Sequence, residues 1–115
     1  MISENLGLIY TLAMFILADL ITGIAKAVKR KKVKSGIIYH GLMKKAGELL
    51  IVTLAGVIEV EIGVPMFTLV ILFYIGCEGI SIVENMGVIG VPMPDILTSY
   101  FEDLHSKGGE VNENK

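Results

Sequence analysis

Apolar residues fill three long stretches of the 115-residue chain, and short polar or proline-containing segments separate them. The first stretch, Leu6 to Ala25, has 20 residues, which is about the length that a helix needs to cross the hydrocarbon core of a bilayer. The second stretch ends at the Val64-Pro65 pair, because proline restrains the residue before it and stops a helix. This pattern predicts three membrane-spanning helices, at about residues 6–27, 44–64 and 66–85.

The residues after the third stretch follow a different pattern. Glycines 87 and 90 and prolines 92 and 94 predict an interruption after Asn85. Asp95 can then cap a short helix over residues 95–104, which has one apolar side and is too short to span a membrane. We therefore predict an all-α membrane domain over residues 1–105 and a polar, disordered tail over residues 106–115.

Positive charge is concentrated in one part of the chain and sets the expected orientation. Eight of the ten Lys and Arg residues lie between Lys26 and Lys45. The densest part is a basic loop formed by Lys29, Arg30, Lys31, Lys32 and Lys34. Such a loop is typical of the cytoplasmic side of a membrane, beside anionic lipid headgroups. The N-terminus is then outside and the C-terminus inside. Binding of nucleic acid is disfavoured, since the loop is short, lacks aromatic residues and adjoins a membrane span.

Acidic and polar side chains interrupt all three apolar stretches. An ionised group at membrane depth costs roughly 2.5–3.5 kcal/mol on insertion scales, so a functional role is the default interpretation. At about 100° per residue, Glu78, Ser81 and Asn85 of the third stretch share one helical face, and Glu84 lies at the edge of that face. The candidate residues of a polar face for a pore or an oligomer contact are Asp19, Glu48, Glu59, Glu78, Ser81, Glu84 and Asn85.

Several of these residues have two open interpretations. Asp19 either neutralises Lys26 beside the membrane surface or lines a contact between helices or an aqueous path. Glu84 and Asn85 either belong to the buried polar face or lie among the lipid headgroups. The second stretch either spans, with Glu59 near the outer surface, or is a partly amphipathic helix packed within an assembly. Lys44 and Glu48 are spaced to form an ion pair along one helix.

The polar faces predict self-association. Three helices of one protomer are not expected to shield so many acidic groups from lipid, so the carboxylates should face other copies or water. Small residues that would let helices approach closely are Gly23, Ala27, Gly76 and Gly79.

Enzymatic chemistry has no support in the sequence. It contains no Ser-His-Asp set, no cluster of metal ligands and no phosphate-binding loop. His40 has no partner at metal-ligand spacing, and the single cysteine, Cys77, cannot form a disulfide within the chain. We expect neither catalysis nor a cofactor nor a metal.

The chain contains a series of short motifs: Asp19-Leu20-Ile21-Thr22-Gly23 with Lys26-Ala27, Ser35, Lys44-Lys45, Glu78 to Asn85, and Gly90-Val91-Pro92-Met93-Pro94. Together they resemble the toxin secretion/phage lysis holin family, which includes Gram-positive phage holins and clostridial toxin-export holins. The motifs occur in order over roughly residues 15–105.

The resemblance implies a multi-pass protein of the bacterial cytoplasmic membrane. Such a protein forms homo-oligomers and opens lesions through which an endolysin or a toxin leaves the cell. Two alternatives stay open at this stage. One is a small multidrug-type proton-coupled exporter, and the other is an antiholin or structural subunit that assembles without opening the membrane.

Overall fold

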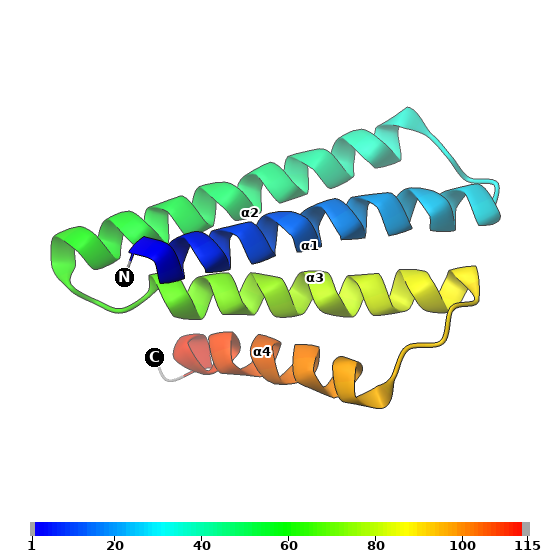
Figure 1. The fold of residues 1–115 in the computed structure, drawn as a ribbon. Helices are drawn as coiled ribbons and strands as arrows, with labels where there is room; N and C mark the ends of the chain where they lie inside the picture. The colour runs from blue at the N-terminus through cyan, green and yellow to red at the C-terminus, as the bar shows by residue number, and fades with distance from the viewer. Residues whose placement is uncertain (1, 114–115) are drawn as a thin grey trace.

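The computed structural model describes the backbone of residues 2–113 and the side chains of residues 5–108. This part of the chain forms four helices: α1 (Ile2–Lys29), α2 (Ser35–Ile62), α3 (Phe67–Ile89) and α4 (Asp95–Glu113). Each helix runs antiparallel to the one before it, so both described ends of the chain lie at the same end of the bundle (Figure 1). The turn that carries the basic loop and the α3–α4 turn lie at the opposite end (Figure 1). An all-helical fold is thereby confirmed.

Two glycines define where α2 and α3 end. Gly63 and Gly90 have φ angles of 86° and 103°, in the left-handed region where a side chain would be strained. Their N–H groups donate to the carbonyl oxygens of Glu59 and Met86, both at 2.9 Å. This is a common way of satisfying the last carbonyl groups of a helix, and the prolines that follow prevent the helices from continuing.

Several helix boundaries differ from the prediction. α1 begins at Ile2 rather than near residue 6 and ends at Lys29 rather than near residue 27. α2 begins at Ser35 rather than near residue 44, because the chain after the basic loop turns apolar at once and contains no proline. α3 continues through Gly87 to Ile89, since a single glycine costs a helix only about 1 kcal/mol. α4 continues to Glu113, so residues 106–113 are helical where a disordered tail was predicted. The remaining tail residues, 114–115, lie outside the described residues.

α3 is the central helix of the bundle. It packs extensively against α1 and α4 and less closely against α2, whereas α1 and α2 touch each other only slightly. The buried apolar cluster draws on all four helices, with Leu12 and Ile71 almost fully enclosed. Its members are Leu12, Val52, Ile71, Ile75 and Leu104.

α4 lies so close to α3 that two glycines are required at the contact. A Cβ atom on Gly76 would lie 2.5 Å from the backbone nitrogen of His105, and one on Gly79 would lie 2.5 Å from the ring of Phe101. The Phe101 ring also meets Phe15 of α1 edge-on, with 5.5 Å between ring centroids. The contact continues to Gly108, which is why α4 extends beyond its predicted end.

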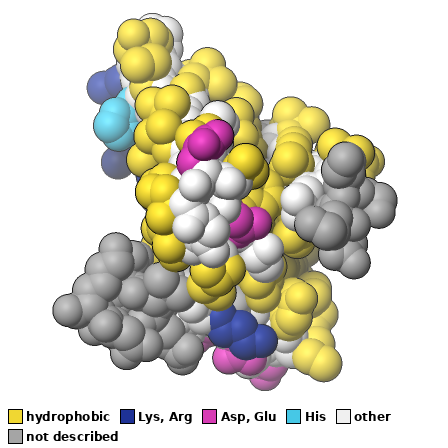
Figure 2. All heavy atoms as spheres, turned by 90° about the vertical axis from the view of Figure 1, so that its left-hand side faces the viewer, with side chains coloured by type: hydrophobic (Ala, Val, Ile, Leu, Met, Phe, Trp, Pro, Cys, Tyr) yellow, Lys and Arg dark blue, Asp and Glu magenta, His cyan; other side chains and the backbone are white. Residues whose placement is uncertain are grey.

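The outer surface of the bundle is largely apolar. Figure 2 looks onto the end where α2 leads into α3, where hydrophobic side chains surround a small patch of backbone and acidic side chains. Two segments are long and apolar enough to cross a membrane, Asn5–Lys29 and Phe67–Ile89. Only 11% of the first segment's most apolar window and 28% of the second's are buried, whereas the core helix of a soluble protein would be mostly buried. Two candidate spans are therefore supported, and α2 as a third stays a prediction.

The glycine contact yields a first testable prediction. Replacing Gly76 by Ala should force α4 away from α3, because the colliding atoms are backbone atoms that cannot rotate aside. We expect the free energy of unfolding to fall by about 1–3 kcal/mol, measured by circular dichroism during titration with SDS in a mild detergent. The matched control is Gly87→Ala on the same helix, where nothing lies within 4 Å and stability should stay equal or rise slightly. Equal stability of the two variants would contradict the close packing of α4.

Candidate functional site

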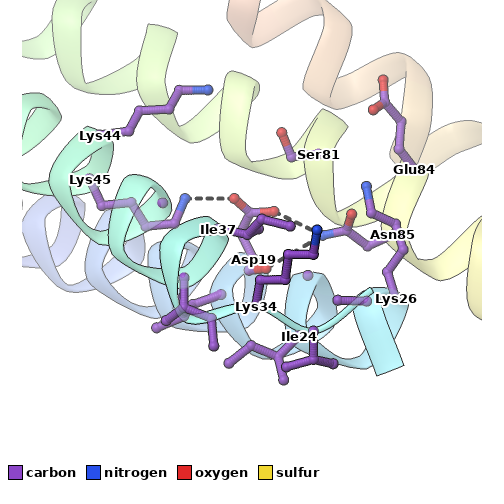
Figure 3. Close-up of a pocket in the computed structure, with 16 residues that line it drawn as sticks. Asp19, Ile24, Lys26, Lys34, Ile37, Lys44, Lys45, Ser81, Glu84 and Asn85 are labelled. Carbon is purple, nitrogen blue, oxygen red and sulfur yellow. Dashed lines mark hydrogen bonds and ion pairs between the residues drawn. The ribbon is translucent and has the colours of Figure 1, made fainter. Parts of the chain in front are cut away.

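Three charged side chains from three helices meet inside the bundle. The Nζ atom of Lys45 on α2 lies 2.6 Å from Oδ2 of Asp19 on α1, and 3.0 and 3.1 Å from the two carboxylate oxygens of Glu78 on α3. The exposed fractions of these side chains are 11% for Lys45, 14% for Asp19 and 2% for Glu78. Figure 3 shows Lys45 pointing toward Asp19. We call Asp19, Lys45 and Glu78 the ion cluster.

Asn85 extends the ion cluster by about two helical turns along α3. Its side-chain amide donates to Oδ1 of Asp19 at 3.0 Å and to the hydroxyl oxygen of Thr22 at 2.9 Å. The Thr22 hydroxyl in turn donates to the carbonyl oxygen of Ala18 at 2.8 Å. Gly23 lies beside the amide, and a Cβ atom there would sit at an ordinary contact distance of 3.7 Å from the Asn85 nitrogen. The buried polar atoms of Asp19 and Asn85 are thus satisfied within one chain.

Helical spacing explains why these residues meet. Asp19 and Thr22 are one turn apart on α1, and Glu78 and Asn85 are two turns apart on α3, so each pair shares one face. On α2 the buried residues are Lys45, Glu48, Val52 and Ala55, which recur every three or four positions. The same α2 face that carries the lysine therefore also carries apolar contacts farther along the bundle.

The ion cluster and its surroundings contain more acid than base. Glu48 is 8% exposed, lies one turn after Lys45, and has a carboxylate oxygen with no hydrogen-bond partner. It is also a close enough neighbour of Glu78 to interact with it. Lys45 pairs with Asp19 and Glu78 and not with Glu48, and a buried carboxylate oxygen without a partner is energetically costly. The arrangement holds the helices together but leaves part of its acidic charge unmatched.

The expected need for other copies to shield the acidic groups is wrong for Asp19 and Glu78. Both are paired within the protomer, because Lys45 enters the bundle and faces them. The pairing also decides between the two interpretations of Asp19. Its ion-pair partner is Lys45 on another helix and not Lys26, so Asp19 lies at a contact between helices.

The other members of the predicted polar face are spread along the bundle. Ser81 and Glu84 border a cavity beside the ion cluster, and Glu84 is exposed. Glu59 lies at the far end of α2, where it accepts a hydrogen bond from the backbone N–H of Phe67 at 3.1 Å. The structure therefore brings together Asp19, Glu48, Glu78 and Asn85, and it places Glu59 apart from them.

Sequence reasoning missed Lys45 and assigned its neighbour a role instead. The predicted pair between Lys44 and Glu48 is wrong: Lys44 is exposed, and the ion pairs of the described residues involve Lys45. The two lysines point about 100° apart on α2. The spacing of Lys45 from Glu48 and Val52 was the signal that could have identified it.

The predicted packing residues and the basic loop have distinct positions. Gly23 faces Asn85, Ala27 borders the cavity, and Gly76 and Gly79 receive α4. In the basic loop, Lys29 donates to the carbonyl oxygen of Ile89 at 3.2 Å and so connects α1 to the end of α3. The remaining basic residues are exposed: Arg30, Lys31, Lys32 and Lys34. Among the described residues, no group of three His, Cys, Asp or Glu side chains could hold a metal ion.

Comparison with known proteins gives a consistent result. The model of the bacteriophage holin family matches residues 1–106. An uncharacterised protein of Clostridium perfringens strain 13 is 39% identical over 102 residues, which cover 86% of this chain and 76% of that protein. A probable holin of Bacillus phage phi105 is 37% identical over 98 residues, covering 83% of this chain and 72% of the phage protein. No solved structure matches the chain.

The ion cluster yields a second prediction. Replacing Lys45 by Ala should leave Asp19 and Glu78 buried without a counter-charge, and the free energy of unfolding should fall by about 3–5 kcal/mol. Replacing the exposed Lys44 by Ala should change it by no more than about 0.5 kcal/mol. SDS titration in detergent, followed by circular dichroism, measures both values.

A third variant separates charge pairing from packing. In Asp19→Asn, Lys45→Met, Glu78→Gln no charge remains in the ion cluster, so most of the stability lost in Lys45→Ala should return. A triple variant as unstable as Lys45→Ala would show that the lysine stabilises by its size and not by its charge.

Proposed function

Because the chain belongs to the bacteriophage holin family, a non-enzymatic class of membrane-permeabilising proteins, we propose that it assembles in the bacterial cytoplasmic membrane and opens it. The opening would release an endolysin or a toxin from the cytoplasm. The observation that supports this most directly is the ion cluster, which joins three helices of otherwise apolar exterior through charges that lie inside the bundle.

We propose that α1, α2 and α3 all span the membrane. The charges of α2 make it too polar by composition, yet Lys45 and Glu48 face inward, and the outer side of the helix between the exposed Lys44 and Glu61 is largely apolar. The exposed apolar residues in the middle of α2 are Leu49, Leu50, Ile51, Leu54 and Val57. A helix whose charges are paired inside a bundle meets lipid only with its apolar side.

The basic loop sets the proposed orientation. By the positive-inside rule it stays in the cytoplasm, beside anionic lipids, so the N-terminus and the α2–α3 turn are outside. The α3–α4 turn is then on the cytoplasmic side, at the same end of the bundle as the basic loop (Figure 1).

α4 has to separate from α3 if the C-terminus is cytoplasmic. Along α3 it runs back toward the N-terminal end of the bundle (Figure 1). Its outer side carries the exposed charges of Glu102, Asp103 and Lys107, which lipid would disfavour. Separation would uncover Gly76 and Gly79, a small-residue surface against which a helix of another copy could pack. In this proposal α4 covers the surface that the homo-oligomer uses.

The ion cluster would hold the closed arrangement. Opening moves the helices apart, so that the polar face formed by Asp19, Glu48, Glu78 and Asn85 meets water instead of Lys45. A change of membrane potential could favour this step, because moving one charge across 100 mV is worth about 2.3 kcal/mol.

Expression in bacteria tests the proposed function. Induction of the chain should cause abrupt entry of a membrane-impermeant dye and loss of viability after a lag. Growth that continues without dye entry would indicate a subunit that does not open the membrane, and drug resistance without dye entry would indicate an exporter.

The timing of dye entry tests the role of the ion cluster. Glu78→Gln and Asp19→Asn should each advance the onset, because one of the two acidic partners of Lys45 loses its charge. The matched control is Glu61→Gln, an exposed acid at the far end of α2, which should leave the onset unchanged. An unchanged onset in both cluster variants would contradict any role in opening. A delayed onset would show that the charges promote opening instead of resisting it.

Cysteine labelling of intact cells tests the three-span arrangement. In a Cys77→Ser background, an impermeant maleimide should label Val64→Cys and should leave Lys32→Cys and Ser106→Cys unlabelled until the cells are broken open. An unlabelled Val64→Cys would mean that α2 does not span. Labelling of Ser106→Cys from outside would mean that α4 stays against α3.

A further inference from the structure

A cavity opens at the basic-loop end of the bundle, between α1, α2 and α3. Its volume is about 280 Å³, and the Asp19 and Lys45 side chains of the ion cluster form part of its wall (Figure 3). Ser81, Glu84 and Asn85 of α3 lie across from α2 (Figure 3). In the proposed orientation this end is at the level of the cytoplasmic lipid headgroups.

Positive charge dominates the part of the cavity that is free to bind. Lys26, Lys34 and Lys44 line it, and none of them forms an ion pair with a described residue. Lys45 and Asp19 are already paired with each other. Glu84 is the one exposed acid of the wall, so three free cations face one carboxylate.

α2 begins beside the cavity and adds to its positive potential. The helix starts at Ser35 without a side-chain cap, and the N-cap residue Lys34 lines the cavity together with Ile37 and Ile38 of the first turn. The N-terminal N–H groups of a helix carry partial positive charge and favour anions, above all phosphate groups.

The remaining wall is apolar and continues onto the lipid-facing surface. Leu20, Ile24, Val33 and Ile37 line the cavity, and the last three are also exposed on the outside of the bundle. On α1 the apolar surface continues through Ile21 and Val28. A ligand that fits both parts has an anionic head and apolar chains.

We propose that this cavity binds the headgroup phosphate of one anionic phospholipid. Lys26, Lys34 and Lys44 line the phosphate site, and the acyl chains follow the exposed apolar surface formed by Ile24, Val33 and Ile37. Basic pockets between membrane helices on the cytoplasmic side are a known setting for such binding. The bound lipid would fill the space between α1 and α2, which touch each other only slightly.

The inference rests on the proposed membrane location but is tested without any lytic activity. The purified full-length chain in an uncharged detergent is titrated with short-chain phosphatidylglycerol, and the shift of its thermal unfolding midpoint gives the apparent affinity. Phosphatidylcholine of the same chain length and inorganic phosphate are titrated in parallel. Phosphatidylglycerol should raise the midpoint in a saturable way, and the other two should have at least about tenfold weaker effects.

Two double variants of equal charge change identify the site. Lys26→Gln, Lys34→Gln removes two cations from the cavity and should weaken phosphatidylglycerol binding at least about tenfold. Arg30→Gln, Lys32→Gln removes two exposed cations of the same loop region that do not line the cavity, and binding should change less than about threefold. Micelles of uncharged detergent offer no extended anionic surface, so general attraction to a membrane does not contribute.

Three other outcomes of the titrations would overturn the assignment. Equal weakening in both double variants would show diffuse attraction to the loop rather than a site. Saturation by inorganic phosphate as strong as by phosphatidylglycerol would make the occupant a free anion. Equal stabilisation by phosphatidylcholine would show that the acyl chains alone are recognised. A chain that binds phosphatidylglycerol as proposed but never permeabilises cells would leave the cavity assignment intact and contradict the proposed function.

Discussion

The contact of Lys45 with Asp19 and Glu78 is the interaction on which the arrangement of α1, α2 and α3 depends. In a membrane, lipid is as apolar as the side chains of a helix, so burying apolar surface does not choose between neighbours. α1 and α2 touch each other only slightly, yet the lysine of α2 reaches carboxylates of both other helices. Since an unpaired charge is strongly disfavoured in lipid, this pairing decides how α2 lies against the other two helices. Asn85 adds hydrogen bonds to Asp19 and Thr22, which set the register of α3 on α1.

α3 serves two different partners with two different chemistries. The face that carries Glu78 and Asn85 meets charged and polar groups, whereas Gly76 and Gly79 admit the backbone and the Phe101 ring of α4. Glycine contacts are typical of helices that associate within membranes. The charges on the outer side of α4, however, make its contact with lipid energetically unfavourable. In the proposed assembly, the glycine surface that a second copy would use is thus occupied by a helix with charges on its outer side. If the C-terminus is cytoplasmic, insertion and exposure of this surface are the same event.

The features of the fold that could be predicted are those encoded in the spacing of apolar and polar residues along the chain. The apolar runs of α1 and α3 have the length of a span and little competing signal, and the polar face with Glu78 and Asn85 follows directly from helical spacing. The predicted start of α2 was wrong because the residues directly after the basic loop were assigned to the loop, whereas the helix already begins at Ser35. Lys45 was overlooked because a lysine is expected at a surface, and only its distant partners justify its burial. The length of α4 depends on its packing against α3, so it could not be predicted from the residues of α4 alone.

The imbalance of the buried charges connects the closed protomer to the proposed assembly. One lysine pairs with two carboxylates, while Glu48 keeps an oxygen without a partner, so the closed bundle satisfies its acidic groups incompletely. Moving α2 away from α1 and α3 would break both ion pairs at once, and lipid could replace neither. Water could replace them, and so could the same lysine of a neighbouring copy, because a symmetric assembly presents each residue again. Helices joined by charges inside an apolar exterior should therefore separate most easily where several copies meet, which ties the proposed opening of the bundle to the proposed self-association.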